Sequence, residues 1–182
     1  RPSTICARET VAKKHLVPLL GRRRLDRITA EDIQRLKAER SELKNITINY
    51  VLAMLHSVLS VAVEWKVIDR IPVKAKKLKE TPPGFKFYDV GEYDRLVLAA
   101  EKQGNPNHLL TVLLGGEAGL RCSEIRPLRW SDVDLKLASL TVSRALWRNE
   151  EGPPKGGRPR TIPLAPRLLA ALKEHRHLKG PL

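Results

Sequence analysis

The sequence predicts a mainly α-helical protein with a small α+β part, in which an all-α domain precedes a domain with a short antiparallel sheet. Three observations predict this fold class. Apolar residues recur at helical spacing from Asn45 to Val67. Residues 71–87, with three prolines and five lysines, lack this periodicity and are typical of a linker. Strand-like alternation begins only at Leu137. We therefore expect domains at 1–72 and 87–182, joined by a basic linker over 73–86.

Two helices are expected before the long one. The first covers 4–18, with Ser3 as its cap. The second follows Thr29, a residue type that favours the N-cap position because its hydroxyl accepts from a free backbone N–H. Glu31 and Asp32 then lie at the positive end of the helix dipole, where negative charge is stabilising.

The long helix over 45–67 should have one buried and one wet face. Its predicted buried stripe consists of Val51, Leu55, Val58, Ala62 and Trp65. Its predicted wet face carries Asn49, His56, Ser57, Ser60 and Glu64. No signal peptide is recognisable, and we expect no apolar run of the roughly 18 residues that a membrane span needs. No membrane partner is therefore expected.

The rear domain should begin with helices and end with a sheet and one more helix. Asp89 and Glu92 form a capping-box pattern for a helix that runs to Lys102. Further helices are expected over 106–118, 123–128 and 166–175, and strands over 137–143 and 160–164. Neither βαβ alternation nor an internal repeat is present in the sequence.

The charge of the chain points to a polyanionic partner. The 182 residues include 34 Lys and Arg against 20 Asp and Glu, a net charge of +14 with a pI near 10.2. Residues 1–80 carry 18 basic against 9 acidic residues, and residues 81–182 carry 16 against 11. Such an excess is self-repulsive unless a polyanion binds, and nucleic acid is the first candidate. Charge alone leaves double-stranded DNA and RNA both open.

Cysteine and histidine usage gives no sign of a metal site. Cys6 and Cys122 lie far apart and lack the spacing of a zinc site or a disulfide framework, so both are expected to be small reduced core residues. The HRH triplet at 175–177 is interpreted as a polar helix end rather than a metal site. We expect no metal, no cofactor and a cytoplasmic, nucleoid-associated protein.

A distinctive stretch begins at Ala118 with the residues AGLRCSEIRPLRWSDVD. It resembles the first box of the tyrosine recombinases, the family that includes phage integrases. The resemblance implies that Arg121 contacts the scissile phosphate and that Glu124 supports it by orienting nearby basic groups. An arginine suits this role because its permanently charged guanidinium offers a fork of hydrogen-bond donors to phosphate oxygens.

A second box, KGGRPRTIPL at 155–164, is similar to the family's β-hairpin lysine segment. The resemblance implies that Lys155 is catalytic and protonates the departing 5′ oxygen. We expect it at the tip of a hairpin, from which a long side chain can reach a groove. The alternative is an ordinary solvated lysine in a Gly/Pro-rich turn.

The resemblance extends from about residue 3 to 178. ITINYVLAMLHSVLSVAVEWKVIDRIP at 46–72 and GRRRLDRITAEDIQRL at 21–36 match the helical part of the family. It implies an all-α SAM-like core-binding domain over 1–72, followed by the N-terminal portion of an integrase-type catalytic domain. It also implies double-stranded DNA as the partner and a tetramer on DNA for the intact protein.

Ten polar or basic residues are candidates for DNA contact: Lys44, Asn45, Thr47, Asn49, Lys74, Lys76, Lys77, Arg144, Arg158 and Arg160. Each has a simpler alternative. In that alternative, the polar residues near the start of the long helix serve as its cap and nothing more. The lysines form a solvated tether, and the arginines are simply exposed to solvent. Trp130 and Trp147 are expected to pack in the core or the hairpin rather than stack on bases.

The remaining catalytic motifs of the family are not found in these residues. No His is followed three positions later by Arg, and Tyr50, Tyr88 and Tyr93 all precede Arg121. We therefore expect a fragment with a truncated catalytic domain, which binds DNA but lacks the tyrosine nucleophile of site-specific recombination. The alternative is a non-catalytic DNA-binding regulator of the same architecture. An RNA-binding or ribosome-binding protein would leave the box around Arg121 unexplained.

Overall fold

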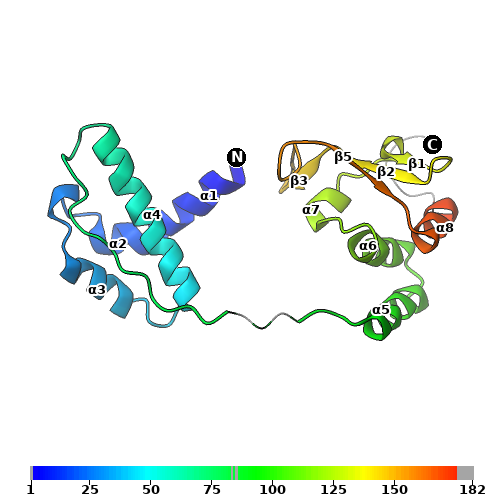
Figure 1. Cartoon of the computed structure of the whole chain (residues 1–182), viewed down its shortest axis with the longest axis horizontal. Coiled ribbons are helices and arrows are strands. Elements are labelled where there is room, and N and C mark those ends of the chain that lie inside the picture. The colour runs from blue at the N-terminus through cyan, green and yellow to red at the C-terminus, as the bar shows by residue number, and fades with distance from the viewer. Residues whose placement is uncertain (1, 83, 85, 176–182) are drawn as a thin grey trace. The chain divides into compact units, whose positions relative to one another are not determined.

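A computed structural model describes residues 2–82, 84 and 86–175 of the chain (Figure 1). The chain divides into two compact units, Arg1–Gly84 and Phe85–Leu182. Each unit has its own apolar core. Residues 176 and 177 of the HRH triplet lie outside the described part of the chain.

The first helix of unit 1 is interrupted by a wider turn. It consists of α1 (Pro2–Val11), a π-helical segment (Ala12–Leu16) and α2 (Val17–Leu20). Pro18 has no N–H to donate one turn back, and the Lys14 carbonyl instead accepts from Arg40 Nη2 at 3.2 Å. Because the helix already includes Pro2, Ser3 lies inside it and the expected Ser3 cap is wrong.

The second helix, α3 (Ala30–Ala38), follows a short 3-10 turn at Leu25–Arg27. Its N-terminus has the expected cap. Thr29 Oγ1 accepts from the Asp32 N–H at 3.3 Å, and Asp32 Oδ2 accepts from the Thr29 N–H at 3.0 Å. The two bonds satisfy backbone donors that a helix start otherwise leaves free.

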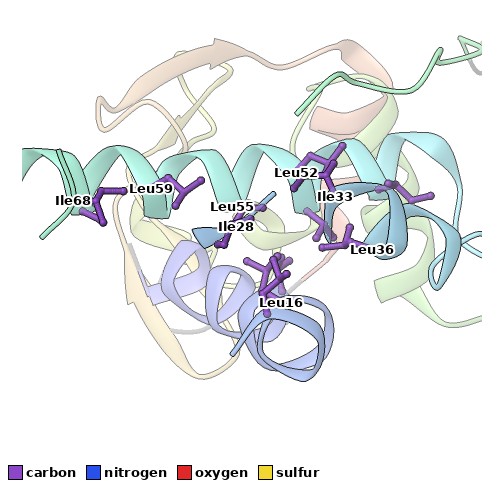
Figure 2. Close-up of a cluster of buried hydrophobic side chains, with 13 residues drawn as sticks. Leu16, Ile28, Ile33, Leu36, Leu52, Leu55, Leu59 and Ile68 are labelled. Atoms are coloured by element: carbon purple, nitrogen blue, oxygen red, sulfur yellow. The ribbon is translucent and has the colours of Figure 1, made fainter. Parts of the chain in front are cut away.

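The long helix α4 (Asn45–Glu64) forms the centre of the unit 1 core. Figure 2 shows Leu52, Leu55 and Leu59 of α4 beside side chains from the rest of the unit. The predicted faces of this helix are only partly confirmed, and Val58 and Ser60 are both half-buried. Trp65, expected to be buried, is 73 % exposed, and Asn49, expected to be wet, is only 4 % exposed. Trp65 follows the last helical residue, where the periodic stripe no longer applies.

Among the described residues, α4 is the one helix whose length and apolar composition would allow it to cross a membrane. An apolar run of this length was not expected from the sequence. Seven of its residues are buried within unit 1, and a core helix meets the same criteria. The helix is therefore weak evidence for a membrane span.

After α4 the chain reverses and returns along the same helix (Figure 1). Lys66 adopts the left-handed conformation at the reversal, with φ of 57°. Residues 73–80 have no regular secondary structure, but Val73, Ala75 and Leu78 pack against the core. The first half of the expected linker is thus attached to unit 1, and the division between units falls after Gly84.

Unit 2 begins with α5 (Val90–Lys102), α6 (Pro106–Gly116) and the short α7 (Cys122–Ile125). The predicted capping box of α5 is confirmed, since Asp89 Oδ1 accepts from the Glu92 N–H at 2.7 Å. The last helix, α8 (Pro166–Glu174), packs against α6. The helices and the sheet enclose a core that includes Leu113, Leu140 and Leu168.

Two small antiparallel sheets lie between α7 and α8. The first has the order β1 (Val133–Asp134), β2 (Ser139–Val142) and β5 (Arg160–Pro163). The second pairs β3 (Ala145–Trp147) with β4 (Glu150–Gly152). The two strands expected from the sequence are therefore confirmed as β2 and β5, whereas the hairpin between them was not predicted.

Candidate functional site

The position of Arg121 is set by the end of α6. Gly119 takes a left-handed conformation, with φ of 63°, and the Leu120 N–H donates to the Leu114 carbonyl at 3.0 Å. The Leu120 side chain is buried, which anchors the reversal. Arg121 follows as the residue that precedes α7, with its side chain 57 % exposed. The backbone is thus fixed while the guanidinium faces solvent.

Glu124 lies one turn into α7 and holds Arg121 at two points. Its Oε2 accepts from the Arg121 backbone N–H at 3.0 Å, and its Oε1 accepts from Arg121 Nη1 at 3.2 Å. The Glu124 side chain is 1 % exposed. A carboxylate so far from water needs nearby positive charge to remain ionised.

That charge comes mainly from Arg160, at the start of β5. Arg160 Nη1 donates to Glu124 Oε1 at 3.0 Å, and Nη2 donates to Oε2 at 2.7 Å. The two parallel bonds form the bidentate geometry that a planar guanidinium and a carboxylate favour. Arg121, Glu124 and Arg160 are called the arginine clamp below.

The clamp has a defined charge. The hydrogen bond from Arg160, together with the Arg121 N–H and the two positive charges, lowers the pKa of Glu124 to about 2 despite its burial. One carboxylate between two guanidinium groups leaves a net charge of +1. The exposed guanidinium of Arg121 is therefore available to a second anion, such as a phosphate, while its orientation is held from behind.

Lys155 lies in a different place from the one expected. The tip of the β3–β4 hairpin is Arg148 and Asn149, between the paired residues Trp147 and Glu150. Lys155 follows β4, in a turn closed by the Gly157 N–H and the Pro154 carbonyl at 2.8 Å. The prediction that Lys155 lies at a hairpin tip is thus wrong. The hairpin is formed by β3 and β4, which were not predicted, and its turn lies before Lys155. Lys155 is exposed in the segment that leads to Arg160.

The other arginines predicted to contact DNA differ in their availability. Arg158 is exposed. Arg144 is paired with Asp132, and its side chain is only 21 % exposed. Arg160 is committed to the clamp. The structure therefore assigns Arg144 and Arg160 internal ion pairs, which the sequence could not show because each partner is distant along the chain.

The polar residues at the start of α4 also divide into two groups. Lys44 is exposed as the N-cap residue, and Thr47 is half-buried. The side-chain amides of Asn45 and Asn49 donate hydrogen bonds to the returning segment. Asn45 Nδ2 donates to the Lys79 carbonyl at 2.7 Å, and Asn49 Nδ2 donates to the Leu78 carbonyl at 2.9 Å. Direct DNA contact by Asn49 does not fit its burial, and neither asparagine caps the helix. Lys74, Lys76 and Lys77 are exposed.

Three further expectations concern metal, cysteine and aromatic residues. Over residues 2–82, 84 and 86–175, no group of three His, Cys, Asp or Glu side chains gathers where it could hold a metal ion. Cys122 is exposed rather than buried, because it is the first residue of α7 on the surface of unit 2. Trp130 is buried, as expected for a core residue. In the hairpin, Arg148 stacks on Trp147, with its Cζ 4.7 Å from the centroid of the ring.

Sequence and structure comparisons identify what this architecture resembles. The model of the phage integrase N-terminal SAM-like domain matches residues 1–38. The structure of the Tn1549 transposon integrase in complex with circular intermediate DNA superposes with a TM-score of 0.81 over 100 % of this chain and 63 % of that one, at 20 % identity. The chain has the fold of an integrase, and it resembles the tyrosine recombinase family.

Two curated integrases are similar over much of this integrase-like chain. An integrase of Streptomyces ambofaciens is 26 % identical over 177 residues, which are 91 % of this chain and 45 % of the relative. The ICEBs1 integrase of Bacillus subtilis (strain 168) is 24 % identical over 149 residues, 80 % of this chain and 40 % of the relative. The chain thus spans less than half the length of the curated integrases that it matches.

Proposed function

We propose that this chain is the DNA-binding part and the front of the catalytic site of a site-specific tyrosine recombinase. The observation that carries the proposal is the arginine clamp, in which the exposed Arg121 is oriented by a buried carboxylate. The integrase fold, the integrase names of the relatives and the net charge of +14 all support it. Double-stranded DNA is the proposed substrate, and a nucleoid-associated cytoplasmic location agrees with it.

In the proposed reaction, Arg121 binds the scissile phosphate and stabilises the charge that builds up on its oxygens. A tyrosine hydroxyl from sequence beyond Leu182 loses its proton, forms the new P–O bond and displaces the 5′ oxygen. Lys155 gives that oxygen a proton as the P–O bond breaks. Attack by another 5′ hydroxyl then reverses the step and releases the tyrosine. No cofactor is required, because one phosphodiester is exchanged for another.

The test has two stages. The source gene is sequenced beyond the Leu182 codon, where an open frame with His-x-x-Arg and a later Tyr is expected. The protein encoded by that frame is then incubated with DNA from the ends of the element that carries it, and covalent protein–DNA complexes are counted.

Arg121→Ala should retain most DNA affinity and abolish the covalent complex, whereas Arg126→Ala, at the other end of the same short helix, should retain both. Cleavage that survives Arg121→Ala would contradict the proposed role. A stop codon directly after Leu182, with salt-sensitive DNA binding, would favour the non-catalytic regulator instead.

A further inference from the structure

We propose that residues 73–80, called the strap, form a preassembled track for the phosphates of duplex DNA, which Asn49 holds on the surface of unit 1. This inference rests on the proposed function for its partner. The inference goes beyond that function because the sequence predicted only a basic linker here and made Asn49 a candidate for direct DNA contact. In the structure, Asn49 is instead a positioning residue that acts through the strap.

Asn49 engages both backbone groups of one strap residue. Its Oδ1 accepts from the Leu78 N–H at 2.8 Å, and its Nδ2 donates to the Leu78 carbonyl at 2.9 Å. The same Nδ2 donates to Glu80 Oε1 at 2.6 Å. With Asn49 only 4 % exposed, these bonds satisfy an amide that burial would otherwise leave unpaired. Undocking the strap would exchange these bonds for bonds to water and would expose the apolar side chains of Val73, Ala75 and Leu78, so the docked state is favoured.

Two further hydrogen bonds attach the strap to unit 1, one on each side of Leu78. Asn45 Nδ2 donates to the Lys79 carbonyl at 2.7 Å, and Lys37 Nζ donates to the Lys76 carbonyl at 2.8 Å. Both hydrogen bonds are accepted by backbone carbonyl oxygens of the strap. The lysine side chains of the strap are therefore left available for an external partner.

The burial pattern of the strap separates two kinds of side chain. Val73, Ala75 and Leu78 are half-buried against the core of unit 1. Between and after them, the exposed side chains are Lys74, Lys76, Lys77 and Lys79. Four exposed ammonium groups thus belong to a segment whose backbone is held at three residues, Lys76, Leu78 and Lys79.

Fixing the backbone in advance matters for affinity. A free tether loses conformational entropy when its lysines settle along a phosphate backbone, whereas a docked strap has already lost it on folding. The same four charges should therefore bind more tightly from the docked strap. The number of phosphates neutralised, which sets the salt dependence, should not change.

The experiment uses the whole 182-residue chain and a short fluorescein-labelled DNA duplex of arbitrary sequence. Anisotropy gives the Kd at several salt concentrations, and hydrogen exchange of the Leu78 amide reports strap docking. The variants are Asn49→Leu, Asn45→Ala at an exposed position, and one variant, the Lys→Gln set, in which Lys74, Lys76, Lys77 and Lys79 are all changed to Gln. Asn107→Ala, an exposed asparagine of unit 2, is the matched control.

Asn49→Leu and Asn45→Ala should speed Leu78 exchange and raise Kd by about three- to tenfold, with the salt slope unchanged. The Lys→Gln set should reduce the slope by about three to four, and Asn107→Ala should change nothing. Asn45→Ala keeps the test valid if Asn49→Leu fails to fold, because Asn45 is at the surface.

Other outcomes separate this inference from the proposed function. No binding by the unaltered chain would overturn both. Salt-sensitive binding that is insensitive to the Lys→Gln set would overturn the track alone. Weaker binding by the Lys→Gln set, with normal Kd in both asparagine variants, would show a flexible tether and overturn the role of Asn49.

Discussion

Arg160, the first residue of β5, donates to both carboxylate oxygens of Glu124 in α7, at 3.0 and 2.7 Å. This pair joins the sheet to the short helix that carries Arg121. It also supplies most of the compensation for a carboxylate that is almost fully buried. The stability of unit 2 and the orientation of the proposed phosphate-binding arginine therefore depend on the same contact.

Replacing the carboxylate by its neutral isostere tests the stabilising part of this contact. Glu124→Gln should lower the free energy of unfolding of unit 2 by about 2–3 kcal/mol, because one bond from Arg160 is lost and the other no longer has an ionised acceptor. Urea unfolding followed by Trp fluorescence measures this change. Glu151→Gln is the control, since its pair with Arg129 is about half exposed on both sides and should contribute less than about 1 kcal/mol. Equal losses in the two variants would contradict the special role of Glu124.

The pH dependence of stability should report the same carboxylate. The pKa of Glu124 is lowered from 4.5 to about 2 on folding, mainly by the hydrogen bond from Arg160. A depressed folded-state pKa contributes stability that is complete above the unfolded pKa and is lost as pH falls through the folded one. Between pH 5 and 2 the wild type should therefore lose about 3 kcal/mol more than Glu124→Gln. Parallel unfolding curves of the two proteins over this range would refute the assignment.

Local signals in the sequence predicted the starts of α3 and α5 correctly, although the Ser3 cap of the first helix was wrong. The capping pairs at Thr29 and Asp89 involve residues three positions apart, so their chemistry is visible without a fold. The hairpin of β3 and β4 was missed for the converse reason. Its turn contains Arg148 with φ of 55°, where a glycine or an Asn-Gly pair would have signalled the reversal.

The candidate site shows the same division. Arg121 and Glu124 are neighbours on one turn of helix, and their relation was expected from spacing and resemblance. Arg160 joins them from 36 residues away, and nothing local distinguishes it from the exposed Arg158. Likewise, Asn49 looked like a wet helical residue because its partner, the strap at Leu78, is only brought back by the fold.

Packing at the end of α6 gives a prediction that is independent of charge. A Cβ at Gly116 would clash with the hydroxyl group and ring edge of Tyr93, whereas a Cβ at Gly115 would meet nothing within 4 Å. Gly116→Ala should therefore destabilise unit 2 by about 1–3 kcal/mol. Gly115→Ala should raise stability by up to about 1 kcal/mol, because alanine favours the helix. Thermal unfolding by circular dichroism compares the two, and similar melting temperatures would contradict the Tyr93 contact.

The final prediction concerns how Arg160 acts on the proposed reaction. In the protein extended through its tyrosine, Arg160→Lys keeps the charge but cannot form two parallel bonds from two nitrogens to Glu124, so Arg121 should lose its fixed orientation. Formation of the covalent DNA complex should slow by about tenfold or more, while the Kd for uncleaved DNA changes less than twofold. Arg158→Lys, two residues earlier and exposed, should leave both quantities unchanged. If Arg160→Lys instead weakens binding as much as it slows cleavage, Arg160 contacts DNA directly and the clamp is not its main role.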